Sequence, residues 1–288
     1  MGLRIQNNIE AFNTHRQLTA TGVQASKSME KLSSGYRINR AADDAAGLGI
    51  SEKMRGQIGG LAQAQRNAQD GISLVQTAEG ALTEVHSMLQ RVRDLKVQYN
   101  NGTNSSDDKD AIAAEVAQIA LEVGDIVSDT KFNGTAVFGS NTFSFQVGAN
   151  DSETISTTAA DFSGAISNTG TGGLQEFLAL STAALAATGL CNTGAGGSLS
   201  NISVIDYAIK NVSSARANFG AVQNRLEHRL NNLATYQENL TASESRIRDV
   251  DMAAEMTKFT KLNILQQAGT SMLAQANQAP QGVLSLLR

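Results

Sequence analysis

The feature that most constrains the fold is a run of apolar residues spaced three and four apart, from about Asp44 to Asn100. This spacing returns to one side of an α-helix, so it predicts a single helix along the whole run. At 1.5 Å per residue the helix is on the order of 80 Å long, far longer than helices of ordinary globular domains. Its apolar positions are Ile58, Leu61, Ala68, Ile72, Val75, Leu82, Val85, Leu89, Val92, Leu95 and Tyr99.

A second helix is predicted to fold back antiparallel on the first. The turn-forming residues of Asn100–Asp108 end the first helix and offer caps to the next one. Apolar residues then return at spacings of four and three, at Ile112, Val116, Ile119, Val123 and Ile126.

Both ends of the chain show the same helical spacing with little charge. A C-terminal run from Ile202 to Leu240 continues through Met272 and Ala276, and we expect it to break at Pro280. Each fully buried Leu, Ile or Val is worth about 1.5–3 kcal/mol, so we expect these ends to be disordered in the monomer or buried against neighbours. The N-terminal stripe is Leu3, Ile5, Ile9, Phe12, Leu18, Ala25, Met29 and Leu32.

Between the N-terminal stripe and the long run lies a junction segment, residues 31–58. Ser33, Ser34 and Gly35 suit a helix end, and Asp43 and Asp44 are expected in the first turn of the next helix. Arg37 and Arg40 stand beside these acids, which predicts a joint dense in paired charge. Periodicity alone favours an ordinary loop between two helices.

The middle of the chain is the least regular part. An Asn-Gly turn within Phe132–Thr135 and alternation over Phe143–Val147 predict one or two small β-hairpins. Residues 140–200 are rich in Gly, Thr, Ser and Asn, with one expected helix near Leu174–Thr188. The segment is too poor in large apolar residues for a separate large domain.

Composition narrows the class of protein. One proline, no tryptophan and 5% aromatic residues favour long helices packed through small side chains. A net charge of -4 does not indicate the basic surface that binding to nucleic acid requires. Cys191 is the single cysteine, so no intramolecular disulfide can form. There is no apolar run long enough to span a membrane and no secretory signal, which predicts a cytoplasmic protein unless a dedicated apparatus exports it.

No residue pattern predicts an enzyme, a metal site or a cofactor site. His15, His86 and His228 lack the spacing of a metal motif, and Gly194–Gly197 does not fit a phosphate-binding loop. Asn101 and Asn201 begin glycosylation sequons, which Asn- and Ser-rich chains produce by chance.

Sequence motifs in three regions of the chain resemble those of bacterial flagellins. They are LSSGYRINRAADDAAGLGISEKMR in the junction segment, NAQDGIS with TAEGAL in the long run, and SESRIRDVDMA with LQQAG and MLAQAN near the C-terminus. The resemblance covers roughly residues 1–140 and 195–288. A match in so many separate parts is far more specific than any single short motif.

The resemblance implies a mainly α fold. It would be a long antiparallel coiled-coil and helical-bundle rod formed by both halves of the chain, with small hairpins and no large outer domain. Residues 1–40 and 245–288 would form a terminal coiled-coil core domain. Residues 41–244 would form a helical bundle that carries the variable segment at about 132–200.

The implied function is that of a structural subunit that polymerises into the flagellar filament, the propeller for swimming. The implied location is extracellular, after unfolded export through the flagellar secretion apparatus without a cleaved signal peptide. The alternatives are a hook-filament junction protein and, in another class, a signalling hairpin of the chemoreceptor type, which usually needs a membrane span. Implied partners besides the chain itself are the filament cap protein, the hook-filament junction proteins, an export chaperone and a flagellin-sensing Toll-like receptor.

The resemblance to flagellins implies two sets of functional residues. The positions that contact the Toll-like receptor in similar flagellins match Gln90, Arg91, Leu95 and Gln98, together with Glu115 on the returning helix. The planar guanidinium of Arg91 would donate paired hydrogen bonds to the receptor, and Leu95 would be an apolar anchor. Lys96 stands where similar flagellins usually have a small apolar residue.

The second set is the expected polymerisation core: Ile5, Ile9, Phe12, Leu18, Met29, Leu32, Leu262, Leu265, Met272, Leu273, Val283, Leu284, Leu286 and Leu287. The expected spoke that connects this core to the rest of the chain is Arg37, Arg40, Asp43 and Asp44.

Overall fold

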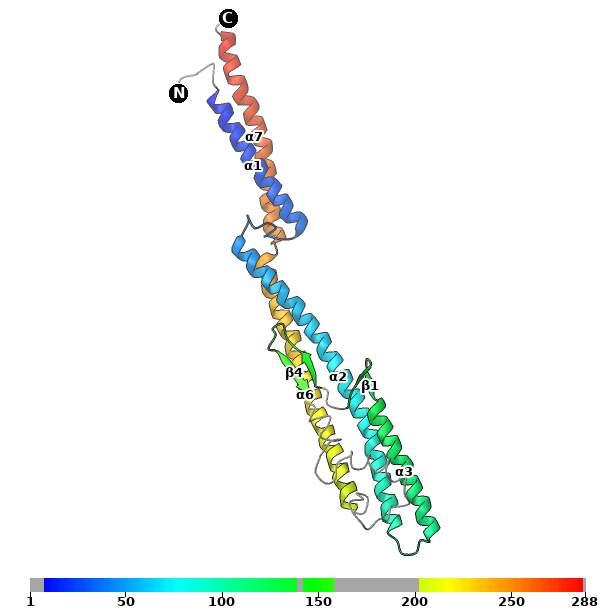
Figure 1. Cartoon of the computed structure of the whole chain (residues 1–288). Coiled ribbons are helices and arrows are strands. Elements are labelled where there is room, and N and C mark those ends of the chain that lie inside the picture. Colours follow the sequence, from blue (N-terminus) through cyan, green and yellow to red (C-terminus); the bar gives the residue numbers. More distant parts are fainter. Residues whose placement is uncertain (1–7, 139–141, 158–201, 287–288) are drawn as a thin grey trace. The chain divides into compact units, whose positions relative to one another are not determined.

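The computed structural model describes residues 8–138, 142–157 and 202–286, with side chains of the last helix described as far as residue 278. The chain is mainly α, as the sequence predicts. Two compact units divide it: unit 1 is Met1–Ile58 with Glu238–Arg288, and unit 2 is Gly59–Gln237. The described elements are α1 (Ile9–Ser34), α2 (Ala45–Tyr99), α3 (Ser106–Asp129), β1 (Lys131–Phe132), β2 (Thr135–Ala136), β3 (Phe143–Gln146), β4 (Thr154–Thr157), α6 (Ile202–Arg248) and α7 (Met252–Leu286) (Figure 1).

Helix α2 confirms the long helix within one residue at each end. In unit 2 its buried positions keep the alternating spacing of three and four that places side chains along one seam. Gly71 lies on this seam because a Cβ there would come within 3.1 Å of the Phe145 ring and 3.3 Å of Leu226. The glycine lets the β3 hairpin and α6 approach α2 closely.

Helix α3 packs antiparallel to α2, as predicted. Ser105 and Asp108 form a capping box at its start, so two backbone N–H groups are satisfied where the chain reverses. Arg91 of α2 donates to Glu115 of α3 at 2.8 Å, which fixes the register of the two helices. The core positions of α3 are Ile112, Val116, Ala120 and Val123.

Two β-hairpins are present, where the sequence predicts one or two. Asn133 and Gly134 both have positive φ, as a two-residue type I′ turn between β1 and β2 requires. Strands β3 and β4 pair from Phe143 opposite Thr157 to Gln146 opposite Thr154. The helix expected near residues 174–188 lies outside the described residues.

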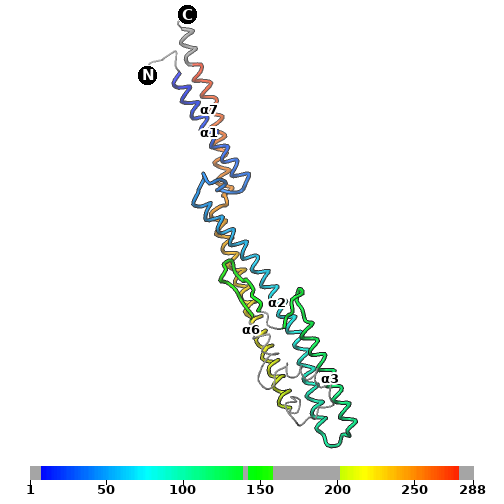
Figure 2. Tube along the Cα trace, viewed as in Figure 1, coloured from blue at the N-terminus to red at the C-terminus, as the bar shows by residue number. Residues whose placement is uncertain are grey.

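The core of unit 2 lies where α2, α3, α6 and the hairpins meet. Figure 2 shows α2 between α3 and α6 in this unit. The β3 hairpin is tied down because Asn67 of α2 donates to the Gln146 carbonyl at 3.1 Å and Arg229 of α6 donates to the Val147 carbonyl at 3.0 Å. The largest fully buried side chains of the unit are Phe219, Leu61, Leu82, Leu89, Ile205, Leu226, Leu233, Val75 and Val85.

Candidate functional site

The two ends of the chain form an antiparallel helical pair within unit 1, α1 against α7 (Figure 1). Asn8 donates to the Ala276 carbonyl at 2.7 Å, and Leu18 packs against Gly269. Farther along the pair, the Ser28 hydroxyl donates to the Glu255 carboxylate. These contacts order the pair from one end to the other and set its register.

The buried face of α1 is made mainly of small and polar residues. Thr21, Ala25 and Ser28 are the buried side chains of this helix. The Thr21 hydroxyl donates to the Gln17 carbonyl at 2.9 Å in its own helix, so its methyl group can face α7 without an unsatisfied polar atom. The full seam, spaced three and four apart, is Ala11, Thr14, Leu18, Thr21, Ala25, Ser28 and Leu32.

The stripe predicted for α1 therefore combines two faces of the helix. Leu18, Ala25 and Leu32 lie in the seam, whereas Ile9, Phe12 and Met29 are exposed. The prediction that all of them share one stripe is wrong because the sequence reading counted only apolar residues. Threonine and serine could be recognised as seam residues only by their spacing from Leu18 and Leu32.

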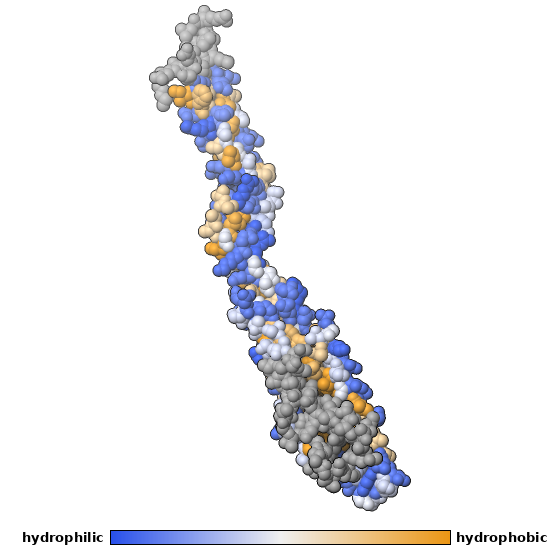
Figure 3. Space-filling model, in the orientation of Figure 1, coloured by the Kyte–Doolittle hydropathy of each residue, from blue (hydrophilic) through white to orange (hydrophobic). Residues whose placement is uncertain are grey.

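Helix α7 repeats this arrangement. Leu262 is buried and Leu273 is half-buried, but Leu265 and Met272 are 46% and 56% exposed. Figure 3 shows hydrophobic residues reaching the surface at several places along unit 1. Of the thirteen large apolar side chains that are exposed in the described residues, eleven belong to unit 1: Ile9, Phe12, Val23, Met29, Tyr36, Ile50, Met252, Met256, Ile264, Leu265 and Met272.

The helix break expected at Pro280 occurs elsewhere. Helix α7 runs through Pro280 to Leu286, whereas α6 and α7 are separated at residues 249–251. Since a proline removes only one N–H, a helix can continue on both sides of it. Of the remaining predicted core residues, Ile5 and Leu287 lie outside the described residues, and the side chains of Val283, Leu284 and Leu286 are not described.

The break at 249–251 is held by the junction segment. Gly35 ends α1 in the left-handed conformation, and Tyr36 then pairs with Asp249 in a short antiparallel bridge. The Arg37 N–H donates to the Arg248 carbonyl at 2.6 Å, and the Val250 N–H donates to the Gly35 carbonyl at 3.0 Å. The backbone groups at the end of α6 thus find partners outside the helix, which allows the helix to stop there.

The charges of the junction segment pair differently from the prediction. Asp44 accepts from the Gly47 N–H at 2.8 Å and so caps α2, rather than lying in its first turn. Asp43 accepts from the backbone N–H groups of Arg40 and Asn39, and the hydrogen bond from Arg40 is the main reason that its pKa is lowered.

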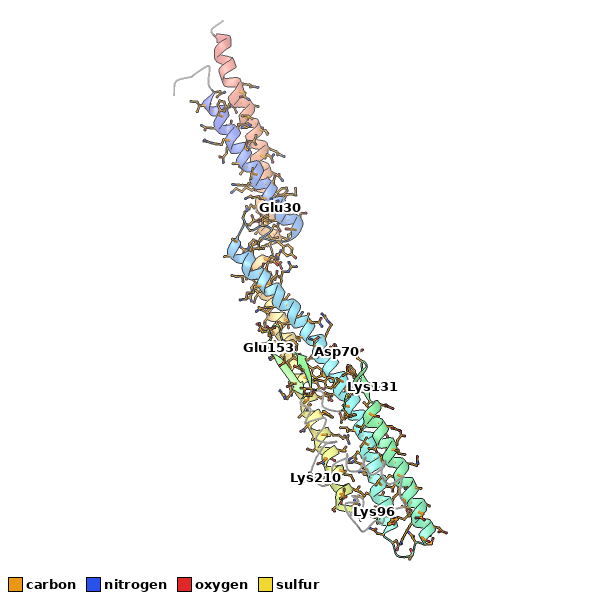
Figure 4. The ribbon with its side chains drawn as sticks, viewed as in Figure 1. Glu30, Asp70, Lys96, Lys131, Glu153 and Lys210 are labelled. Carbon is orange, nitrogen blue, oxygen red and sulfur yellow. The ribbon has the colours of Figure 1, made fainter. Side chains whose placement is uncertain are left out.

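The two arginines also bind other partners than the expected aspartates. The Arg37 guanidinium donates to the Ile247 carbonyl at 2.6 Å. Arg40 forms an ion pair at 2.9 Å with Glu30, which Figure 4 labels on α1. Sequence proximity suggested the Arg–Asp pairs, but the two aspartates accept hydrogen bonds from backbone N–H groups.

Arg248 is a junction residue that the sequence reading did not single out. Its guanidinium donates to Glu52 at 2.8 Å and lies 4.8 Å from the centre of the Tyr36 ring. The sequence feature that could have identified Arg248 is its position in the C-terminal motif SESRIRDVDMA.

The predicted receptor face of unit 2 is exposed except for one residue. Gln90, Arg91 and Gln98 are exposed, and Arg91 is paired with Glu115. Leu95 is only 2% exposed and belongs to the core of unit 2. Its assignment as an apolar anchor for a partner is wrong, because its spacing from Val92 turns it inward.

The described residues contain neither a metal-binding cluster nor a membrane-spanning helix. Within residues 8–138, 142–157 and 202–286, no group of three His, Cys, Asp or Glu side chains is placed to hold a metal ion. None of the helices in that part of the chain is long and apolar enough to cross a membrane.

Comparisons with known proteins match nearly the whole chain. The family model for the bacterial flagellin N-terminal helical region matches residues 5–142, and the model for the C-terminal helical region matches residues 202–287. Flagellin of Bacillus subtilis (strain 168) is 49% identical over 99% of this chain and 100% of its own length. Flagellin of Halalkalibacterium halodurans is 51% identical over 99% of each chain.

A third relative has the role in its name. The flagellar filament 33 kDa core protein of Treponema phagedenis is 45% identical over 99% of each chain. Nothing in these matches favours a hook-filament junction protein. The chain therefore belongs to the bacterial flagellin family, whose members are structural subunits of the flagellar filament.

Proposed function

We propose that the α1–α7 pair is the device by which this flagellin assembles, and that its exposed apolar residues pack against other copies of the same chain. The observation that carries the proposal is the concentration of eleven exposed large apolar side chains in unit 1. Burying about half of them is worth on the order of 10 kcal/mol. That gain is comparable with the roughly 4–15 kcal/mol that association costs in lost freedom of motion.

The proposed contact is heterologous, because a filament grows by adding copies without closing a ring. In this proposal residues 1–40 and 245–288 form the terminal core domain that polymerises, and residues 41–244 form the helical bundle. Arg37, Arg40, Asp43 and Asp44 are the proposed spoke. Their bonds to backbone groups and to Glu30 order the junction segment within unit 1.

A matched pair of variants tests the assembly surface. Leu265 in unit 1 and Tyr236 in unit 2 are both on helices and both 46% exposed. We expect Leu265→Gln to raise the critical concentration for filament growth by about tenfold, the equivalent of about 1.4 kcal/mol. Tyr236→Gln should leave it unchanged. Sedimentation and electron microscopy measure assembly, and equal effects of the two variants would remove the proposal.

The proposal extends to export and to the proteins that handle the subunit. We propose that the chain leaves the cell unfolded through the flagellar secretion apparatus, without a cleaved signal peptide, and meets an export chaperone, the junction proteins and the filament cap. The support is the α1–α7 seam, whose small side chains give little stability to the isolated pair. A strain lacking the flagellar export gate should retain the full-length protein inside the cell, and secretion from such a strain would contradict the proposal.

We also propose that the monomer is recognised by a flagellin-sensing Toll-like receptor through the exposed face of α2 and α3. The supporting observation is the Arg91–Glu115 pair, whose side chains are 60% and 44% exposed and form two hydrogen bonds. Gln90 and Gln98 complete this face. Leu95 supports it from the core, and the neighbouring Lys96 is itself buried beside Tyr99.

Cells bearing the receptor provide the test. Monomer should activate them and intact filament should not. Arg91→Ala should weaken the response, whereas Arg225→Ala, which removes an exposed arginine of α6, should not. Leu95→Ala should weaken the response only as far as it unfolds unit 2. An unchanged dose response of Arg91→Ala would remove the receptor assignment and leave the filament function intact.

A further inference from the structure

The methionines of the chain are unevenly exposed. Of seven methionines, four have about half of their surface in solvent: Met29 at 53%, Met252 and Met256 at 49%, and Met272 at 56%. All four lie on α1 or α7 in unit 1. Met54 and Met88 are half-buried.

Three of the exposed methionines share one side of the α1–α7 pair. The hydrogen bond between Ser28 and Glu255 sets the register, and Met29 and Met256 are the residues that follow these two partners. In an antiparallel pair of right-handed helices, residues that follow facing seam positions lie on the same side of the seam. Met252 is one turn before Met256 on the same face of α7, so the three lie within about 6 Å along the axis.

We propose that this methionine cluster, Met29, Met252 and Met256, is an oxidation site that controls self-assembly. The inference rests on the proposed assembly surface, and the oxidant is a peroxide that meets the free subunit. The thioether sulfur attacks one oxygen of hydrogen peroxide, the O–O bond breaks and a sulfur–oxygen bond forms. The second oxygen leaves as hydroxide and takes the proton of the transferred oxygen, which gives water. Sulfur loses two electrons and the peroxide gains them, giving methionine sulfoxide.

The product changes the surface in the direction that opposes assembly. Methionine is flexible and apolar, so it adapts to a neighbouring chain, whereas the sulfoxide is polar and must find a hydrogen-bond donor when buried. Three sulfoxides on one side of the pair combine their effects at a single contact. Once subunits are assembled, neighbouring copies cover the sulfurs, so the filament is protected while the free subunit is sensitive.

The first experiment maps oxidation on the full-length chain with all of its methionines kept. Monomer and preformed filament, both carrying Cys191→Ser to remove the single thiol, are treated with hydrogen peroxide and examined by peptide mass spectrometry. We expect the cluster to oxidise several-fold faster than Met54 and Met88 in the monomer and to be protected in the filament. Equal rates in monomer and filament would overturn the inference.

The second experiment measures assembly. Peroxide should raise the critical concentration of the monomer by about tenfold or more, and methionine sulfoxide reductases with a thiol reductant should reverse the rise. The variant Met29→Leu/Met252→Leu/Met256→Leu keeps the apolar volume and should lose most of the peroxide sensitivity of assembly, whereas the control Met54→Leu/Met88→Leu should remain as sensitive as wild type.

The outcomes separate the two proposals. Oxidised wild-type protein that assembles normally, or a Leu variant as sensitive as wild type, overturns the oxidation site and leaves the assembly surface intact. Untreated wild-type protein that does not polymerise would overturn the proposed assembly surface and the oxidation site with it.

Discussion

Units 1 and 2 are built from helices with the same spacing of three and four, but the side chains that are fully buried at these positions differ in size. In unit 2 the seam of α2 holds large apolar side chains, and Phe219 of α6 is fully buried against the core. In unit 1 the α1–α7 seam holds Thr21, Ala25 and Ser28, while Phe12 is 71% exposed. A helical repeat thus specifies a packed face without specifying whether that face stabilises the subunit alone or in a polymer.

In our proposal this difference gives stability to one unit and assembly to the other. We expect unit 2 to fold without neighbours, because its core buries many large apolar side chains. The α1–α7 seam of unit 1 buries mainly small residues, which allow the helices to approach closely, and the large exposed residues of the unit are those that we propose pack against other copies.

Removing residues 1–40 and 245–288 should have the largest effect. We expect a soluble, folded monomer that no longer polymerises, because the deletion takes away α1 and α7 and leaves the core of unit 2. Sedimentation and circular dichroism measure the two properties. Long filaments from the truncated protein would show that residues 1–40 and 245–288 are not the assembly device. Full-length filaments should lose helical circular dichroism signal sharply when they dissociate.

The same substitution in the two units should have different consequences. Phe219→Ala leaves a cavity in unit 2 and should lower its free energy of unfolding by about 3–5 kcal/mol. Phe12→Ala removes an exposed side chain and should leave that free energy unchanged while raising the critical concentration for assembly. Urea unfolding of the monomer and sedimentation of filaments separate the effects, and a stable Phe219→Ala protein would contradict the assignment of the core.

Enlarging the small seam of unit 1 should weaken the α1–α7 pair. A Cβ on Gly269 would lie 3.2 Å from Leu18, so we expect Gly269→Val to push the helices apart at a cost of about 1–3 kcal/mol. Gly80→Ala, where a Cβ meets nothing within 4 Å, should instead stabilise α2 by up to about 1 kcal/mol. Thermal dissociation of filaments measures the first effect and unfolding of the monomer the second.

The smallest expected effect is a dependence on pH at Glu255. Burial raises the pKa of this carboxyl, but the Ser28 hydrogen bond and the charge of Lys258 outweigh burial and lower the pKa below its ordinary value of 4.5. The ionised group therefore stabilises the pair above about pH 4.5, and this contribution is lost as the pH falls through the lowered pKa.

A difference between variants isolates this contribution from that of other carboxylates. Filaments of Glu255→Gln should lose less stability than wild type between about pH 4.5 and more acidic conditions, as measured by thermal dissociation. Glu10→Gln, at an exposed carboxylate of the same pair, should follow wild type. Identical pH profiles for wild type and Glu255→Gln would exclude a role of Glu255 in holding the pair.

Local features of the sequence determined most of the helices and the first hairpin. The apolar spacing from Asp44 to Asn100 predicts α2 to within one residue, because helical periodicity is a property of neighbouring residues. The same holds for the Asn133-Gly134 turn, whose positive φ angles follow from the two residue types. The sequence also indicates the flagellin family, through the motifs near both ends of the chain.

Only the tertiary structure decided which residues face which partner. Leu95 was read as an exposed anchor and lies in the core, while Thr21 and Ser28 were overlooked and lie in a seam. The break after Arg248 was also missed, because its cause is the backbone of Gly35 and Arg37, more than 200 residues earlier in the chain. Periodicity predicts that a helix has a buried face. Which residues form that face depends on contacts between segments that are far apart in the sequence and meet only in the folded chain.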